Sequence, residues 1–183
     1  MRLSRIHLSS LLLLLAAAAC DDSAVAPWSV NTFAAQDSLR HFRTDAAAYS
    51  LTTTNLGTEG RVGVTLTNRS GRTMYFVNCN GATSLSIQHL DGARWSGFWS
   101  PVLRDCLSPP ITVPDGGTHF FDIRIFAGKA GSNVHPQFGA APRTGVYRVI
   151  WHDVYFTYQP RLPWGEPVPE SQRVSNTFHL VVP

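Results

Sequence analysis

The chain has 183 residues, of which 44% are hydrophobic and only 15% are charged, and it contains 14 glycines and 12 prolines. This composition favours a protein of strands and turns over a mainly helical one. The 15 Lys and Arg exceed the 12 Asp and Glu by three, but the counts become 13 and 12 once Arg2 and Arg5 near the N-terminus are set aside. The other arginines are scattered singly, which argues against nucleic-acid binding.

Residues 1–19 have the three parts of a secretory signal peptide. A basic start with Arg2 and Arg5 precedes an uncharged, largely apolar segment at 8–19, which ends in small alanines. A transmembrane helix needs about 20 apolar residues. This run is shorter and is closed by Asp21 and Asp22, so we expect an exported protein with a removed leader.

The end of the leader, Leu15-Ala16-Ala17-Ala18-Ala19-Cys20, resembles the lipobox of bacterial lipoproteins. The resemblance implies cleavage before Cys20, which would carry a thioether-linked diacylglycerol and usually an amide-linked acyl chain such as palmitate. Stable membrane anchoring takes more than one such chain. Ala17 stands where the family most often has leucine, so an ordinary signal peptide followed by an incidental cysteine stays open. The lipobox reading places the protein in the bacterial cell envelope, on the periplasmic or the cell-surface face of a membrane.

Three cysteines leave one without a partner in a secreted protein. If Cys20 carries lipid, Cys79 and Cys106 remain, and we expect them to form a disulfide in an oxidising compartment. Closing this loop would stabilise the fold by about 3.5 kcal/mol in the chain-entropy model. The alternative is a reactive or metal-binding thiol pair, which the lack of a C-x-x-C motif disfavours.

Residues 20–45 show no strand pattern and predict a lipidated cysteine with a flexible tether, followed by one domain at 46–183. In that domain Val62, Val64 and Leu66 alternate with polar residues as in a half-buried strand. Similar short runs, separated by turns, predict a single antiparallel β-sandwich of seven to nine strands. The expected strands lie at 49–55, 61–68, 73–78, 83–90, 93–98, 111–113, 118–126, 145–158 and 176–182.

The order of the motifs in this domain resembles bacterial immunoglobulin-like domains of envelope lipoproteins. The residues that carry the resemblance are Asn68 to Gly71, Asp91, Gly92 and Trp95, Pro114 to Gly116, and Gly145, Tyr147 and Arg148. It covers roughly residues 48–182 and implies an immunoglobulin-like sandwich. Each motif is short and structural, and a shared fold does not fix a function.

No catalytic motif is recognisable in the chain. G-x-S-x-G, H-E-x-x-H and G-x-G-x-x-G are all missing. Met74 precedes both Cys79 and Cys106, which disfavours a blue-copper site. The histidines lack H-x-H spacing, although residues from separate strands can still meet in a sandwich. We expect no catalytic residues, no metal and no cofactor; the histidines considered are His41, His89, His119, His135, His152 and His179.

Two tryptophans are candidates for a binding surface. Trp99 lies near the end of an expected strand, and Trp164 lies in the proline-rich run 159–169, which resembles a polyproline II segment. Exposed aromatic side chains can stack on sugars or anchor a protein partner. Packing inside the domain is equally consistent for these two, and we expect Trp95 and Trp151 in the core.

These features together predict a lipid-anchored, non-enzymatic envelope protein whose immunoglobulin-like domain binds or positions another envelope component. The expected partners are the membrane, through the lipid, and an envelope protein or glycan, without nucleic acid. Two alternatives remain. One is a proteinase inhibitor, because one bacterial inhibitor family shares this immunoglobulin-like pattern, and the other is a carbohydrate or cell-wall binding module using Trp99 and Trp164.

Overall fold

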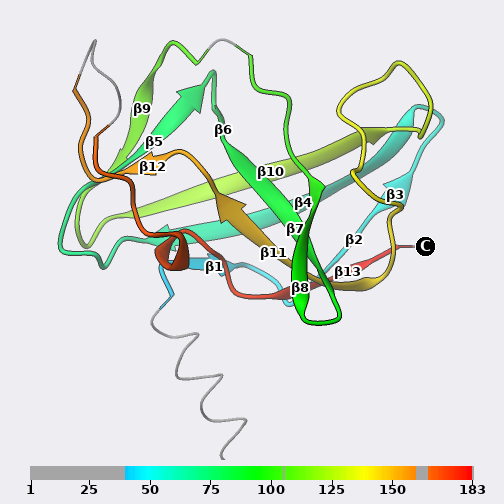
Figure 1. The fold of residues 1–183 in the computed structure, drawn as a ribbon, viewed down its shortest axis with the longest axis horizontal. Helices are drawn as coiled ribbons and strands as arrows, with labels where there is room; N and C mark the ends of the chain where they lie inside the picture. The colour runs from blue at the N-terminus through cyan, green and yellow to red at the C-terminus, as the bar shows by residue number, and fades with distance from the viewer. Residues whose placement is uncertain (1–39, 105, 160–164, 183) are drawn as a thin grey trace, which may run out of the picture.

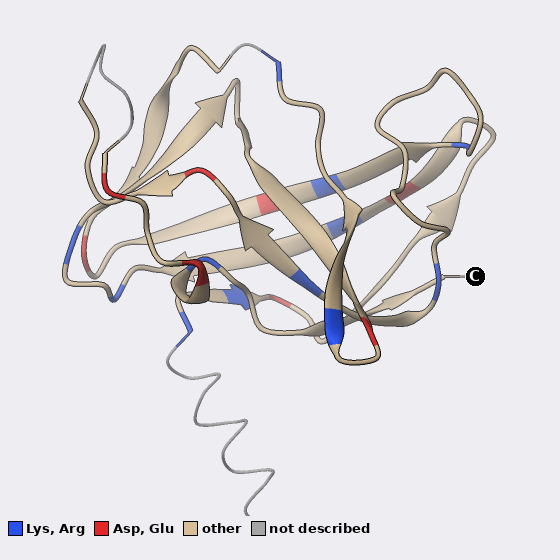
Figure 2. Ribbon diagram, viewed as in Figure 1, with Lys and Arg blue, Asp and Glu red and all other residues tan. Residues whose placement is uncertain are grey.

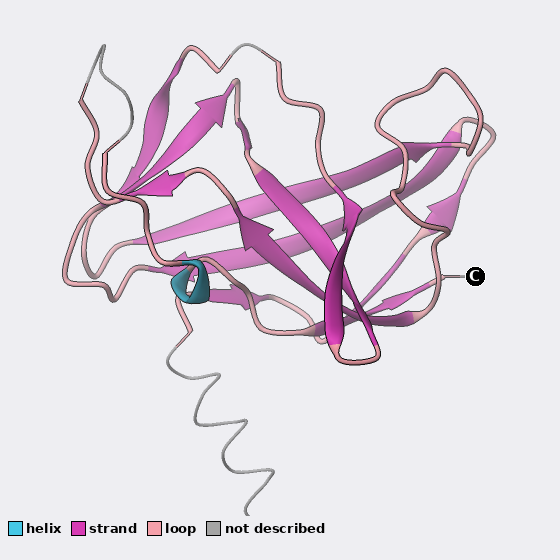
Figure 3. Ribbon diagram, viewed as in Figure 1, coloured by secondary structure: helices cyan, strands magenta, loops and turns pink. Residues whose placement is uncertain are grey.

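The computed structural model describes residues 40–104, 106–159 and 165–182. Within these residues the chain forms thirteen strands and one 3-10 turn, η1 (Glu170–Gln172), so the predicted all-β sandwich is confirmed (Figures 1 and 3). The strand number exceeds the predicted seven to nine because several strands have only two or three residues. No helix among the described residues is long and apolar enough to cross a membrane.

The strands form three sheets, in which all pairs are antiparallel except β2 with β13. The first sheet has the order β1–β4–β10, with β3 also paired to β4: β1 (Phe42–Thr44), β3 (Thr52–Thr53), β4 (Gly57–Thr67) and β10 (Thr118–Gly128). The second has the order β2–β13–β11–β7–β8: β2 (Ala48–Ser50), β13 (Phe178–Val181), β11 (Gly145–Trp151), β7 (Leu85–Asp91) and β8 (Arg94–Trp99). The third joins β12 (Val154–Tyr155), β5 (Met74–Cys79), β6 (Ala82–Thr83) and β9 (Ser108–Val113).

The third sheet continues the second through a fork. Only Ser84 separates β6 from β7, and only His152 and Asp153 separate β11 from β12. At this point the backbone N–H of His152 donates to the Ser84 carbonyl at 2.9 Å. Beyond it the two strands separate, and β5 pairs with β12 on one side and β6 on the other. The second and third sheets therefore form one forked layer, and the long β4–β10 pair crosses behind it (Figure 1).

The core lies between this forked layer and the first sheet. β10 shows the expected alternation, with Phe121 and Ile123 buried and Asp122 and Arg124 exposed. At the centre Phe42 stacks on Trp151 with 4.2 Å between ring centroids, and Phe121 lies 5.1 Å from Trp151. Such aromatic pairs add to the free energy gained from burial, so this cluster contributes to the packing of the two layers.

The strand β1 lies ahead of the predicted domain boundary. Phe42 is fully buried and lies opposite Leu66 of β4, and the backbone N–H of Asp45 donates to the Gly63 carbonyl at 3.0 Å. Residues 42–44 therefore pair within the first sheet, ahead of the predicted start of the domain at residue 46. A three-residue strand with one apolar side chain is too short to show alternation in the sequence. The leader at 1–19, Cys20 and the rest of the predicted tether up to residue 39 lie outside the described residues.

Two of the turns that carry the resemblance meet in space. Asn68 is fully buried, and its side-chain amide donates to the carbonyls of Arg72 and Val113 at 2.7 and 2.9 Å. Its own carbonyl accepts from Gly116 at 2.8 Å, so the turn at 68–71 is tied to the turn at 114–117. A third motif residue, Tyr147, is buried and donates its hydroxyl to the Arg143 carbonyl at 2.6 Å. This is the geometry of the tyrosine corner in immunoglobulin-type sandwiches.

Candidate functional site

The two long sides of the sandwich are built differently. On one side the chain passes directly from β2 in the second sheet to β3 in the first, and β13 pairs with both β2 and β11. The backbone N–H of Leu51 donates to Val181 at 2.9 Å, and Phe42 and Ser175 form a bridge between the layers. We call this the closed side. The opposite side, where β10 faces β8, β6 and β9, is the open side.

Part of the open side is covered near the end of β10. The indole N–H of Trp99 donates to the Phe126 carbonyl at 2.9 Å. The backbone N–H of Gly128 donates to Pro136, and that of Gly139 donates to Phe98, both at 2.8 Å. These bonds join β10 to β8 through the segment 129–139, so β10 is covered from Phe126 onward.

The rest of β10 has an unpaired edge. The Phe126 carbonyl and the Gly128 N–H both bond away from β4, and along an antiparallel strand alternate residues direct their backbone groups to the same side. The N–H and C=O groups of Phe120, Asp122 and Arg124 therefore also point away from β4. No strand in the described part of the chain pairs with them. We call this stretch the free edge; its groups recur every two residues, or about 7 Å.

A pocket of about 420 Å³ lies along the free edge. Its apolar wall is formed by Leu85, Trp99, Ile111, Phe121 and Ile123. Its lining also includes residues 119–124 of β10, residues 81–83 and Pro101. We call it the edge pocket; its volume is within the range of pockets that hold ligands, about 300 to 1,000 Å³.

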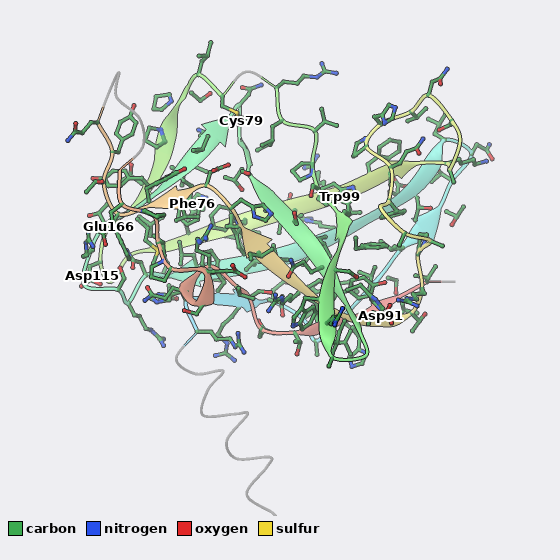
Figure 4. The ribbon with its side chains drawn as sticks, viewed as in Figure 1. Phe76, Cys79, Asp91, Trp99, Asp115 and Glu166 are labelled. Carbon is green, nitrogen blue, oxygen red and sulfur yellow. A yellow bond between two sulfur atoms is a disulfide. The ribbon has the colours of Figure 1, made fainter. Side chains whose placement is uncertain are left out.

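Two features of the sequence build the wall opposite β10. Asn80 and Gly81 both have positive φ, 57° and 90°, as a two-residue hairpin turn requires, and the turn folds β6 back onto β5. The Asn-Gly pair was an available signal for this hairpin that the sequence analysis missed. The predicted disulfide between Cys79 and Cys106 is confirmed, and it fastens the segment 100–107, which contributes Pro101, to the end of β5 (Figure 4).

The outer face beside the free edge carries charges of both signs, and Glu59 lines the same depression there as Arg61 and Arg124. Asp122 forms ion pairs with Arg61 and with Arg124, the latter at 3.4 Å, so one carboxylate faces two guanidinium groups. Charged segments of both signs alternate along β4 and β10 in Figure 2. Both arginine side chains are largely exposed, and such pairs contribute little to stability because water screens them.

At the rim of the pocket, burial lowers the pKa of His119, whose ring packs against Phe121 at 4.6 Å. A histidine with a lowered pKa is neutral at pH 7. His119 therefore adds no charge to the rim of the edge pocket at pH 7, whereas the outer face next to it carries charged groups of both signs. The chain gives no match to models of known protein families, to curated proteins or to solved structures.

Exposed large apolar side chains occur along this side as well as at Leu56, Val134 and Val181. Among the described residues, Val102, Leu107 and Phe120 are large apolar side chains that are 52%, 91% and 48% exposed. Phe120 belongs to the free edge, and the other two belong to the segment fastened by the disulfide. Large exposed apolar groups close together mark interaction surfaces more often than isolated ones do.

Of the two environments that the sequence left open for Trp99, the structure shows packing inside the domain. A β-bulge shifts the pairing of β7 with β8, so that Gln88 lies opposite Gly97 but Ile87 lies opposite Trp99. Phe98 is the extra residue, and both it and Trp99 are buried. Trp99 therefore forms part of the pocket wall and offers no surface for stacking, while Trp164 lies outside the described residues.

The other two tryptophans have different environments. Trp151 is in the core, as expected. Trp95 is only half-buried and stacks with the Arg148 guanidinium, 4.3 Å from its ring centroid, so its expected place in the core is wrong.

One histidine contact resembles part of a catalytic site. Ser86 Oγ lies 2.7 Å from His152 Nε2 and 2.8 Å from Ser100 Oγ, on the outer face of the second sheet. In nucleophilic hydrolases a third group orients the histidine. Among the described residues no carboxylate accepts a hydrogen bond from His152 Nδ1. The contact connects β7 to the residue that follows β11. The described residues also contain no group of three or more metal-binding side chains.

Proposed function

We propose that the protein is a lipid-anchored, non-enzymatic module of the bacterial cell envelope that binds and positions another envelope component through the edge pocket. The observation that carries this proposal is the combination of the free edge at Phe120, Asp122 and Arg124 with an apolar pocket beside it. Unpaired edges are sites at which natural sheets join other chains, and most proteins cover or block them. This edge is left open beside exposed apolar side chains.

The envelope location rests on three features of the chain. The leader at 1–19 has the parts of a signal peptide, and Cys20 follows a lipobox-like sequence. The disulfide between Cys79 and Cys106 supports an oxidising compartment outside the cytoplasm. A test is metabolic labelling with a radioactive fatty acid in a bacterial host. The full chain incorporates the label and Cys20→Ser does not; equal labelling of both proteins would rule out this anchor.

Binding is tested by crosslinking in intact bacterial cells. A photoreactive benzoylphenylalanine replaces Val102 on the open side or, as a matched control, Val181 on the closed side; both side chains are exposed. We expect one dominant envelope protein to be crosslinked from position 102 and not from position 181. If neither position captures an envelope component, the proposed function is wrong.

A further inference from the structure

The side chains of His89 and Arg143 meet beside the tyrosine corner, near the end of β7 and just before the start of β11. We propose that they form an acid-sensitive contact: the neutral imidazole of His89 holds the Arg143 guanidinium, and protonation of His89 releases Arg143 and loosens the segment 140–144. The contact does not depend on what the open side binds. It gives the domain a response to pH in the range in which histidines titrate.

The hydrogen bond between the two side chains fixes the protonation state of His89. Arg143 Nη2 lies 3.2 Å from His89 Nδ1. A guanidinium group only donates hydrogen bonds and keeps its charge at every physiological pH, so His89 Nδ1 is the acceptor. His89 is therefore neutral, with its proton on Nε2. A second proton would have to bind at Nδ1, where it would face a donor and bring two positive charges together.

The imidazole ring of His89 is held in place by β11. His89 is buried, and its ring packs against the Tyr147 ring with 4.8 Å between the centroids. Its Nε2 lies so close to the backbone of Gly145 that a Cβ added there would come within 2.7 Å of it. Because only glycine leaves this room, the ring fills the space between β11 and Arg143. The group that moves on protonation is therefore Arg143.

Arg143 is free to move because its side chain is 55% exposed and has a second, exposed partner. Its Nη2 also lies 3.3 Å from Asp91 Oδ2, and the Asp91 side chain is 68% exposed. Such an ion pair contributes little to stability and can shift toward water without breaking. Asp91 does not neutralise this corner alone, since Arg94 of β8 lies opposite it in the strand pairing. Protonated His89 would therefore face a net positive surrounding.

The surroundings of His89 set the pH at which the contact opens. Burial of the ring lowers the pKa of His89 most, Arg143 lowers it further, and Asp91 raises it by less. The two neighbouring strands place neutral groups beside it, Tyr147 of β11 against the ring and Ser96 of β8 opposite in the pairing. The folded chain therefore resists protonation of His89 until the pH falls below about 6.5, and the contact opens on the acidic side of neutrality.

Release of Arg143 affects the loop that joins β10 to β11. The backbone N–H of Gly139 is bonded to β8, and the Arg143 carbonyl accepts the Tyr147 hydroxyl at 2.6 Å. Between these two points, no hydrogen bond within the described part of the chain fixes residues 140–142. Without the side-chain bond to His89, the segment 140–144 keeps fewer attachments to the sheet. This segment continues directly from 129–139, which covers the far end of β10, so the contact lies at the end of the loop that limits the free edge.

The experiment follows imidazole and backbone NMR signals of the full chain in detergent micelles between pH 8 and pH 5. We expect His89 to carry its proton on Nε2 at pH 8 and to titrate with a midpoint below about 6.5. The amide signals of segment 140–144 should shift with the same midpoint, and their heteronuclear NOE values should fall as the segment becomes more mobile. In Arg143→Gln the midpoint of His89 should rise by about half a pH unit, because a positive neighbour is replaced by a neutral acceptor.

Two histidine variants provide the matched test. His89→Gln keeps an acceptor for Arg143 but does not titrate, so the step in the signals of segment 140–144 should disappear. His179→Gln removes an exposed histidine of β13 and should leave the step unchanged. If His89→Gln does not fold, the shift of the His89 midpoint in Arg143→Gln decides the question, since Arg143 is exposed.

Four results would overturn the acid-sensitive contact: a proton on His89 Nδ1 at pH 8, a His89 that stays neutral at pH 5, an unchanged or lower His89 midpoint in Arg143→Gln, or an equal step of segment 140–144 in His89→Gln. None of them bears on crosslinking from position 102, so failure of the contact is distinguishable from failure of the proposed function.

Discussion

The closed and open sides of the sandwich have similar strands, but they differ in how the backbone N–H and C=O groups of those strands are hydrogen-bonded. On the closed side the backbone groups are consumed by strand pairing, as between β2 and β13, and Phe42 is fully buried between the layers. On the open side one indole hydrogen bond and the segment 129–139 join β10 to β8, the disulfide lies within the forked layer, and the edge of β10 is left unpaired. We therefore expect the closed side to be the more stable one, in line with the uneven local stability of proteins, and the proposed binding site lies on the other side.

The largest expected effect on stability comes from removing the buried ring of Phe42 at the closed side. Phe42→Ala removes a fully buried side chain that stacks on Trp151, and we expect the free energy of unfolding to fall by about 3 to 5 kcal/mol. The matched change on the open side, Phe120→Ala, removes a side chain that is 48% exposed and should cost less than about 1 kcal/mol. Urea denaturation of both variants measures this. Equal losses would show that the two sides do not differ in this way.

On the open side the disulfide between Cys79 and Cys106, and not strand pairing, fastens the segment 100–107 to the end of β5. Replacing both Cys79 and Cys106 by serine opens a loop with a sequence separation of 27 residues. In the chain-entropy model this costs about 3.5 kcal/mol. We also expect the segment 100–107 to exchange its amide hydrogens faster while β1 and β4 change little, as followed by hydrogen exchange and mass spectrometry. An unchanged segment 100–107 would mean that other contacts hold the pocket wall.

A smaller effect is expected at the hydrogen bond that closes the far end of β10. Trp99→Phe keeps an aromatic ring but removes the donor to the Phe126 carbonyl, and we expect a loss of about 1 kcal/mol in thermal or urea unfolding. Trp95→Phe is the control, since the half-buried Trp95 contacts Arg148 through its ring face. If the control is as destabilising as Trp99→Phe, the indole bond does not contribute as described.

The smallest expected effect is the pH dependence of stability, which arises from histidines on both sides of the sandwich. Burial lowers the pKa values of His41 and His119, and burial together with Arg143 lowers that of His89. The unfolded chain then binds more protons than the folded one as the pH falls below about 6.5, so stability decreases toward acidic pH. We expect the urea midpoint to fall from pH 7 to pH 5, and His89→Gln to fall less. A midpoint that rises over this range would contradict the assigned directions.

The sequence predicted the fold wherever the pattern is local. Val62, Val64 and Leu66 alternate in β4, Asp91-Gly92 turns β7 into β8, and an odd number of cysteines pointed to the confirmed pair. These predictions succeed because a strand period, a turn and a cysteine count can all be read within a few residues.

The site could not be predicted in the same way. The inward turn of Trp99 depends on a bulge set by pairing with Ile87, and the free edge of β10 depends on which strands do not pair with it. Both are properties of the assembled sheets. Phe42 was missed because a short strand with one apolar residue gives no period. Only the Asn80-Gly81 turn carried a local signal that was available and not used.

The central claim, that the edge of β10 is unpaired on the open side, is tested most directly by amide hydrogen exchange of the free protein, resolved by residue. The account predicts alternation along β10: the amides of Phe121 and Ile123, which face β4, exchange slowly, and those of Asp122 and Arg124, which face the edge pocket, exchange rapidly. Uniform slow exchange from Phe120 to Arg124 in the free protein would contradict it, because the edge would then already be paired.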